Sequence, residues 1–327
     1  MLAAAASAQE PRFGIRLNEV VVPVSVMTKS GKPVENLTAQ DFLVLNDGKR
    51  QTVRMIASED AGVLPIHAVL VLQTDGGSEP ALAKIKKTAS VVSSYITNDM
   101  EIGSPSLAAV VTVSDELRIL QNLAADPNRL GDTFGRISAG GDAARLLDGV
   151  SLACDMLAAN KDAARRVIVL ISESRDVGSK THFPDVIAKA QKDDVAIYTI
   201  SFSPYTTAFT QKASDRPAPP DQPGSYDPNN TGGLNLLAIP MLLTQLAKVN
   251  VSQAFAQGTG GGHEKFTTLR GLETQLTTIG TEIHNRYTLT FVPQQNQPPG
   301  YHRLSVTIPN APAGWRIHAR EGYWLAP

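Results

Sequence analysis

The sequence predicts an α/β protein whose mostly parallel sheet, with helices on both faces, is inserted into a small antiparallel β-sandwich. Two patterns predict this arrangement. In the middle of the chain, short continuous apolar runs alternate with segments of helical periodicity, whereas near both ends apolar and polar residues alternate with a period of two. Continuous runs are typical of strands buried on both faces, and alternation is typical of strands with one solvated face. At 327 residues, the chain can form one large domain and a smaller one.

Residues 64–285 carry the first pattern. Short bounded apolar runs predict strands at 67–72, 107–113, 117–120, 167–171 and 195–202, the 117–120 strand being an antiparallel edge. Helical spacing predicts helices at 79–96, 127–137, 143–159, 183–191, 234–256 and 270–284. Residues 204–233 are rich in Pro, Asp, Asn and Gly, so we expect a mobile loop insertion there.

Two segments near the end of this region have their own predictions. The run Gly258-Thr259-Gly260-Gly261-Gly262 indicates a flexible hinge. The apolar segment Leu236–Leu246 is expected to pack on the sheet, and the alternative is an exposed docking helix.

Residues 13–60 and 286–327 carry the second pattern. Residues 19–27 alternate as a half-buried strand, Thr38 caps a turn that includes Asp41, and Asn46-Asp47-Gly48-Lys49 separates the two strands of a hairpin. Three more strands are predicted at 287–292, 303–308 and 316–320. Because neither set has enough strands to close a core, we expect the two sets to pair in one sandwich.

The composition excludes several classes of function. A net charge of -1 argues against a protein that binds nucleic acid or an anionic membrane, since these carry a basic face. No apolar run reaches the ~18–20 residues that a membrane-spanning helix needs, so no transmembrane segment is expected. The single cysteine, Cys154, lies in a helical apolar pattern typical of a buried thiol.

The first twelve residues are expected to form a flexible start. Within them, Ala6-Ser7-Ala8 has the small-x-small form of a signal-peptidase site. Our hypothesis is that residues 1–12 include the remnant of a secretion signal and that the protein is secreted or periplasmic. The alternative is an alanine-rich start with no targeting role.

Three stretches together resemble a known family. They are Val20–Val24 with Leu37–Phe42 and Asp47-Gly48, then Val69–Leu72 with its Gly/Ser turn, then Asn285–Leu289 with Arg320–Tyr323. The order and spacing of these three stretches resemble those of the von Willebrand factor A-related proteins of the acidobacterial type. The resemblance extends from about Arg16 to Pro327.

The resemblance implies a Rossmann-like von Willebrand factor A domain with a metal-ion-dependent adhesion site at the carboxyl ends of its strands. In that family an Asp-x-Ser-x-Ser turn, a Thr and a further Asp hold Mg²⁺, and a carboxylate from the partner completes the coordination. Magnesium prefers hard oxygen ligands in octahedral geometry, which explains the residue types.

This chain departs from the family pattern at each position. Gln73, Asp75 and Gly77 stand where Asp, Ser and Ser are expected, Gly141-Asp142 stands for Gly-Thr, and Ser172-Glu173 stands for Thr-Asp. In one interpretation, Asp75, Asp142 and Glu173 converge and still hold Mg²⁺ or another divalent cation. In the favoured interpretation, the site is vestigial and no cofactor is bound. The carboxylates are then solvated, paired with Arg145 or Arg175, or partly protonated.

The predicted function is that of a non-catalytic module of the cell envelope that binds a protein ligand of unknown identity, as adhesion domains do. An alternative is a structural or assembly subunit of an envelope complex, with a sheet edge available for strand addition. An enzyme is not expected, because the sequence lacks the Gly-x-Ser-x-Gly turn of an α/β hydrolase and its histidines show no metal-binding spacing.

Overall fold

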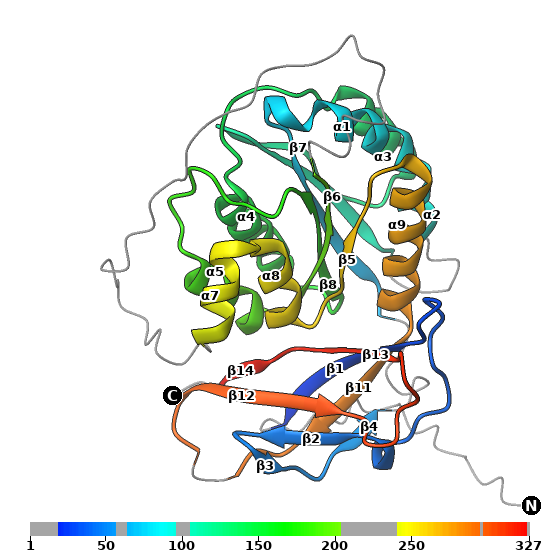
Figure 1. Ribbon diagram of the computed structural model, residues 1–327, viewed down its shortest axis with the longest axis vertical. Coiled ribbons are helices and arrows are strands. Elements are labelled where there is room, and N and C mark those ends of the chain that lie inside the picture. The colour runs from blue at the N-terminus through cyan, green and yellow to red at the C-terminus, as the bar shows by residue number, and fades with distance from the viewer. Residues whose placement is uncertain (1–18, 57–63, 96–104, 204–240, 295–296, 326–327) are drawn as a thin grey trace, which may run out of the picture.

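The computed structural model describes residues 19–56, 64–95, 105–203, 241–294 and 297–325. Figure 1 shows an α/β part, from β5 to α9, beside a smaller part made of antiparallel strands from both ends of the chain. This architecture confirms the predicted fold class. The domain boundaries proposed from the sequence stay a prediction.

The α/β part is built on a six-stranded sheet in the order β10-β9-β8-β5-β6-β7. Its strands are β5 (Ile66–Gln73), β6 (Leu107–Val113), β7 (Leu117–Ala124), β8 (Arg165–Ser172), β9 (Val195–Ser201) and β10 (His263–Lys265). Adjacent strands are parallel except for β7, which is the antiparallel edge that the sequence predicts. The short strand β10 was not predicted.

Helices cover both faces of this sheet (Figure 1). One face carries α1 (Glu79–Ile85), α2 (Ala89–Tyr95), α3 (Pro127–Arg136) and α9 (Leu269–His284), with the 3-10 turns η2 (Gly76–Ser78) and η3 (Lys86–Thr88) before and after α1. The other face carries α4 (Leu146–Ala159), α5 (Phe183–Lys192), α7 (Met241–Val249) and α8 (Val251–Thr259).

Strand β5 shows why both faces of the central sheet have to be covered by helices. All eight of its residues are buried. Successive side chains point to opposite faces of a sheet, so Leu70 and Leu72 join the core under α1 and α9, while Val69 and Val71 join the core under α4.

The smaller part is a sandwich of two four-stranded sheets around a core of its own. One sheet has the order β13-β1-β11-β4 and the other the order β14-β12-β2-β3. The strands are β1 (Val20–Met27), β2 (Leu43–Asn46), β3 (Lys49–Arg50), β4 (Arg54–Ile56), β11 (Arg286–Phe291), β12 (Gly300–Thr307), β13 (Arg316–Ala319) and β14 (Gly322–Leu325). Strand β14 was not predicted.

Strands from the two ends of the chain pair with each other, as expected. Strand β1 lies between β11 and β13, and β2 lies beside β12, all antiparallel. The predicted turn is present, since Asp47 and Gly48 have φ angles of 48° and 77°. The second strand of the hairpin differs from the expected residues 51–56, because Lys49–Arg50 pair with β2 whereas Arg54–Ile56 pair with β11 in the other sheet. Asp41 accepts a hydrogen bond of 2.7 Å from the Thr38 amide, and the capping box there begins the 3-10 turn η1 (Ala39–Asp41).

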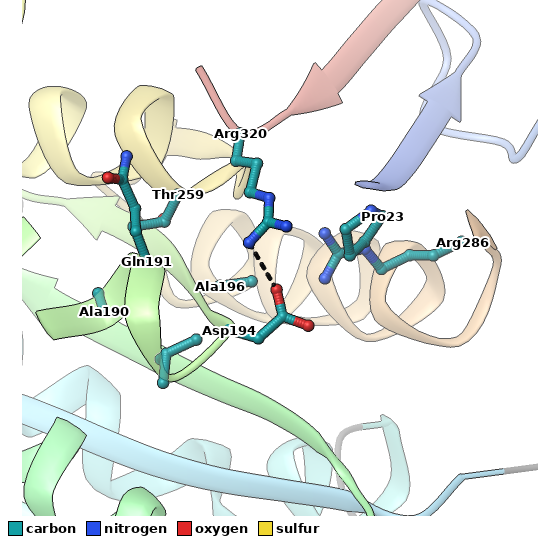
Figure 2. Close-up of a pocket in the computed structure, with 9 residues that line it drawn as sticks. Pro23, Ala190, Gln191, Asp194, Ala196, Thr259, Arg286 and Arg320 are labelled. Atoms are coloured by element: carbon teal, nitrogen blue, oxygen red, sulfur yellow. Dashed lines mark hydrogen bonds and ion pairs between the residues drawn. The ribbon is translucent and has the colours of Figure 1, made fainter. Parts of the chain in front are cut away.

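The two parts are joined by contacts between polar side chains that come from each side. Arg320, just after β13, donates to the Asp194 carboxylate at 3.0 Å (Figure 2). It also donates to the Val21 carbonyl of β1, within the sandwich. Glu282 of α9 pairs with His318 of β13 at 2.9 Å. Since Asp194 precedes β9, Arg320 ties the sandwich to the amino edge of the central sheet.

The prediction for the apolar segment can be followed only in part, because residues 204–240 lie outside the described ranges. Leu243 of α7 is buried against the sheet, which agrees with core packing for the described portion. A helix break occurs at Asn250, whose side chain caps α8 through the Gln253 amide at 2.8 Å. Among the described residues, no helix is long and apolar enough to cross a bilayer.

The prediction of a hinge at Gly258–Gly262 is wrong. Gly258 and Thr259 belong to α8, and all five residues are buried. A Cβ on Gly261 would lie 2.1 Å from the Ile197 carbonyl oxygen of β9. The glycines therefore allow close contact between backbones, which a flexible hinge would not maintain.

We expect Gly261→Ala to destabilise the protein by about 3 kcal/mol, because the new methyl group meets backbone that cannot move aside. The measurement is the free energy of unfolding in urea. Gly131→Ala is the matched control, since Gly131 lies in α3 with no atom within 4 Å of its Cβ position. That change should stabilise the helix by up to ~1 kcal/mol. Equal effects of the two substitutions would contradict this account of the glycine run.

Candidate functional site at the carboxyl edge of the sheet

The loops after β5 and β8 lie side by side at the carboxyl edge of the sheet, where ligands bind in open α/β folds. Gln73, the last residue of β5, is buried, and Asp75 precedes the 3-10 turn η2. Glu173 directly follows β8. The structure therefore brings three of the sequence-predicted positions together.

The side chain of Gln73 connects these two loops. Its Nε2 donates to Asp75 Oδ1 at 2.8 Å, and its Oε1 accepts from the Glu173 backbone amide at 2.8 Å. The Ser78 hydroxyl also donates to Asp75 Oδ1. Asp75 is thus held by hydrogen bonds from its own loop.

Gly77 lies against both carboxylates. A Cβ built on it would be 3.3 Å from Asp75 Oδ2 and 3.8 Å from Glu173 Oε1. Two carboxylate oxygens from different loops therefore gather at a position where the family has a serine hydroxyl. Gly77 has no hydroxyl to offer.

Burial is the main reason that the pKa of Glu173 is raised to about 7, and the neighbouring Asp75 charge raises it further. The Arg175 charge opposes this shift. Around neutral pH, Glu173 is therefore a mixture of protonated and ionised forms. The sequence-based expectation of partial protonation agrees with this environment.

Asp142 lies in the neighbouring loop, whose backbone is fixed by Asp115. The Asp142 and Ala143 amides donate to the Asp115 carboxylate at 3.1 and 2.9 Å, and the Gly141 carbonyl accepts from Gly76 at 2.9 Å. The Asp142 residue itself is exposed. Within the described ranges, no three His, Cys, Asp or Glu side chains are grouped so as to hold a metal ion. The assignment of Asp75, Asp142 and Glu173 as metal ligands stays a prediction.

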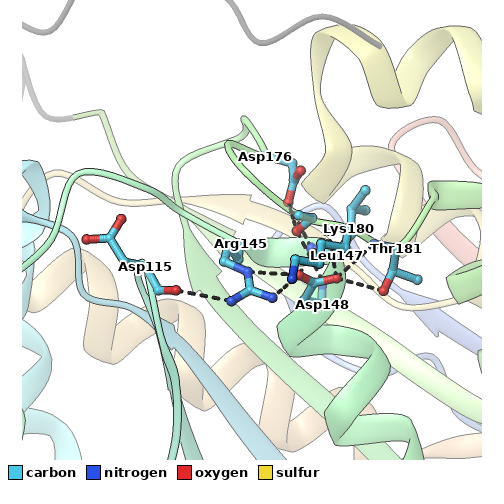
Figure 3. Close-up of polar contacts among 8 residues, drawn as sticks. Asp115, Arg145, Leu147, Asp148, Asp176, Lys180 and Thr181 are labelled. Atoms are coloured by element: carbon cyan, nitrogen blue, oxygen red, sulfur yellow. Dashed lines mark hydrogen bonds and ion pairs between the residues drawn. The ribbon is translucent and has the colours of Figure 1, made fainter. Parts of the chain in front are cut away.

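Sequence reasoning missed the most heavily hydrogen-bonded carboxylate of this edge, Asp148 in the first turn of α4. It accepts from the Arg145 guanidinium at 2.7 and 2.9 Å, from the Lys180 and Thr181 amides, and from the Thr181 hydroxyl at 2.6 Å (Figure 3). Burial alone would raise the pKa of Asp148, but these hydrogen bonds hold it below its ordinary value. Arg145, expected as a partner for the site carboxylates, pairs with Asp148 instead.

A second aspartate secures the same loop. Asp176, after β8, accepts from the Leu147 amide at 2.9 Å and from the Ser179 hydroxyl at 2.6 Å. Burial raises its pKa, and the hydrogen bonds oppose this. Together, Asp148 and Asp176 fasten the loop after β8 to the first turn of α4, so the rim of the site is built from cross-linked loops.

No family model and no curated protein matches the chain. Among solved structures, the chain is similar to a von Willebrand factor type A protein from Catenulispora acidiphila, with 10% identity, a TM-score of 0.48 and coverage of 94% of this chain and 62% of that one. The chain thus spans less than two thirds of that protein.

Two further structures are similar. An aerotolerance-related membrane protein from Bacteroides fragilis has 12% identity and a TM-score of 0.43, covering 67% of this chain and 98% of that one. Proximal thread matrix protein 1 from the mussel byssus, with a zinc-occupied adhesion motif, has 10% identity and a TM-score of 0.44. The match covers 69% of this chain and 47% of that one.

The open α/β sheet defines the class, a Rossmann-like fold with one antiparallel edge strand and two helical layers. The solved structures to which the chain is similar include a von Willebrand factor type A protein, the family that the sequence resembles. Similarity at these levels concerns the fold alone, so the chemistry of the site has to come from its own residues.

We expect Asp148→Asn to destabilise the protein by about 3 kcal/mol, because it leaves the Arg145 guanidinium without its carboxylate in a site where Asp148 is 7% exposed. Urea unfolding measures the change. Asp155→Asn is the matched control, since its carboxylate pairs with Lys189 but is 63% exposed. Asp155→Asn should lower the free energy of unfolding by less than ~1 kcal/mol. A cost for Asp148→Asn as small as the control's would refute the structural role of Asp148.

Glu173→Gln should change the pH dependence of stability. The native pKa of about 7 exceeds the ordinary value of 4.5, so the native state holds a proton that the unfolded state has lost between these values. The stabilisation linked to the Glu173 proton is therefore lost as pH rises from 4.5 through about 7. This contribution is fully present below pH 4.5. The variant should melt above the wild type at pH 8, and its advantage should shrink towards pH 4.5. A constant difference across this range would contradict the assignment. Glu79→Gln, the same charge change at an exposed position at the start of α1, is the control.

Proposed function

We propose that this chain is a non-catalytic binding module of the cell envelope that holds a protein partner at the carboxyl edge of its central sheet. The supporting observation is the cross-linked rim described above. Gln73 joins the loops after β5 and β8, Asp115 fixes the loop that carries Asp142, and Asp148 fixes the loop after β8 to α4. Loops that are ordered before binding lose less conformational entropy when a partner docks.

The exposed side chains on this rim suit recognition by hydrogen bonds and charge. Asp115, Asp142 and Arg175 are exposed and lie on three loops of the same edge. The buried atoms of the same loops provide the support, so these side chains project from a fixed backbone. A surface of this kind favours a protein partner with complementary polar groups.

Photo-crosslinking in the native host tests this proposal. A photoreactive amino acid placed at position 142 or 175 should give the same covalent adduct with one protein, identified by mass spectrometry, in the envelope fraction. Position 161 is the matched control because Lys161 is equally exposed but lies before β8, at the opposite edge of the sheet. Adducts formed only from position 161, or none from positions 142 and 175, would reject this face as the binding surface.

A further inference from the structure

Gln73 occupies the first position of the family's metal-binding turn, and both the nitrogen and the oxygen of its amide make a hydrogen bond. The residue is 1% exposed. Its amide has one orientation that satisfies both neighbours, since Asp75 Oδ1 can accept only from Nε2 and the Glu173 amide can donate only to Oε1. The side chain therefore makes two hydrogen bonds that run to two different loops.

These contacts do not suit a divalent cation. A cation needs oxygen lone pairs directed at it, but here an N–H group of Gln73 and the hydroxyl of Ser78 are both directed at Asp75 Oδ1. The third position of the turn, Gly77, has no ligand atom. The residues at this edge therefore do not fit the metal that the fold class implies.

We infer that the Gln73 amide takes over the structural task of the metal ion, joining the loops after β5 and β8 through a neutral hydrogen-bonded bridge. A carboxylate at position 73 would place a third carboxyl group beside Asp75 and Glu173, and a cation would be needed to hold the three together when they are ionised. The amide removes that need, since it offers a donor to one loop and an acceptor to the other. The binding face is then assembled without metal. This inference goes beyond the proposed function, because it holds whichever partner binds.

Hydrogen exchange of the full chain, followed by mass spectrometry, tests the bridge. The two variants to compare are Gln73→Leu and Gln121→Leu. Gln121 is a matched control because it is 3% exposed and also makes two side-chain hydrogen bonds, with the Ala108 carbonyl at 3.1 Å and the Thr133 hydroxyl at 3.0 Å. The control loses as many hydrogen bonds but none of the links between these loops.

In the wild type, we expect the peptides that contain Asp75 and Glu173 to exchange at the same rate in chelator and in millimolar Mg²⁺. In Gln73→Leu, both peptides should exchange about tenfold faster, and in Gln121→Leu they should keep the wild-type rate. Slower exchange of the wild-type loops on adding Mg²⁺ would overturn the inference. Unchanged exchange of both loops in Gln73→Leu would overturn it as well.

Gln73→Glu keeps the inference testable if the leucine variant does not fold. This substitution restores a carboxylate of nearly the same size, so its melting temperature should fall in chelator and rise by several degrees in millimolar Mg²⁺. The wild type should show no such rise. If the melting temperature of Gln73→Glu does not change in Mg²⁺, a carboxylate at position 73 does not create a cation site, and the inference is overturned. Failure of the crosslinking experiment leaves these results unaffected, so the two proposals fail separately.

Discussion

The pairing of β1 with β11 and β13 is the constraint on which the rest of the molecule depends. It brings the strands that precede the α/β part against those that follow it. The Tyr287 hydroxyl adds a hydrogen bond of 2.7 Å to the Val34 carbonyl across the same junction. Because β5 begins and α9 ends at this sandwich, the amino edge of the central sheet faces it, and the carboxyl edge faces away (Figure 1).

This orientation divides the polar side chains between two tasks. At the amino edge, Arg320 and the Glu282–His318 pair fasten the sandwich to the α/β part. At the carboxyl edge, Gln73 and Asp148 fasten loops to one another and leave the rim open to solvent. The same chemistry, a buried charged or amide group with several partners, therefore fixes the domain junction on one side and the proposed binding face on the other.

Much of the fold could be predicted because burial leaves a direct mark on the sequence. The continuous apolar run of β5 correctly predicts two covered faces. The alternation of β1 predicts one solvated face, which is wrong for its second half, because all four residues from Val24 to Met27 are buried. The glycine run before β10 led to the wrong prediction of a hinge, because glycine serves both for conformational freedom and for close backbone contact. Only the position of Ile197 in the structure decides between these two roles. Strand β14 was missed because its four residues follow β13 after only two others.

The site was harder to predict for a related reason. Gln73 and Glu173 are recognisable as departures from a family pattern, but the bridge between them joins positions 100 residues apart and involves a backbone amide, which has no signature in sequence. Asp148 is an ordinary acidic residue of a helix until the Lys180 and Thr181 amides converge on it. Hydrogen bonds between loops depend on tertiary structure, so residue types alone do not reveal them.

The most direct measurement is a crystal structure of the protein grown with millimolar Mn²⁺, with data collected at a wavelength where manganese scatters anomalously. We expect no anomalous peak beside Asp75 and Glu173, and an intact Gln73 bridge to both loops. A peak within coordination distance of those carboxylates, with the Gln73 side chain turned away, would contradict the claim that this binding face is assembled without metal.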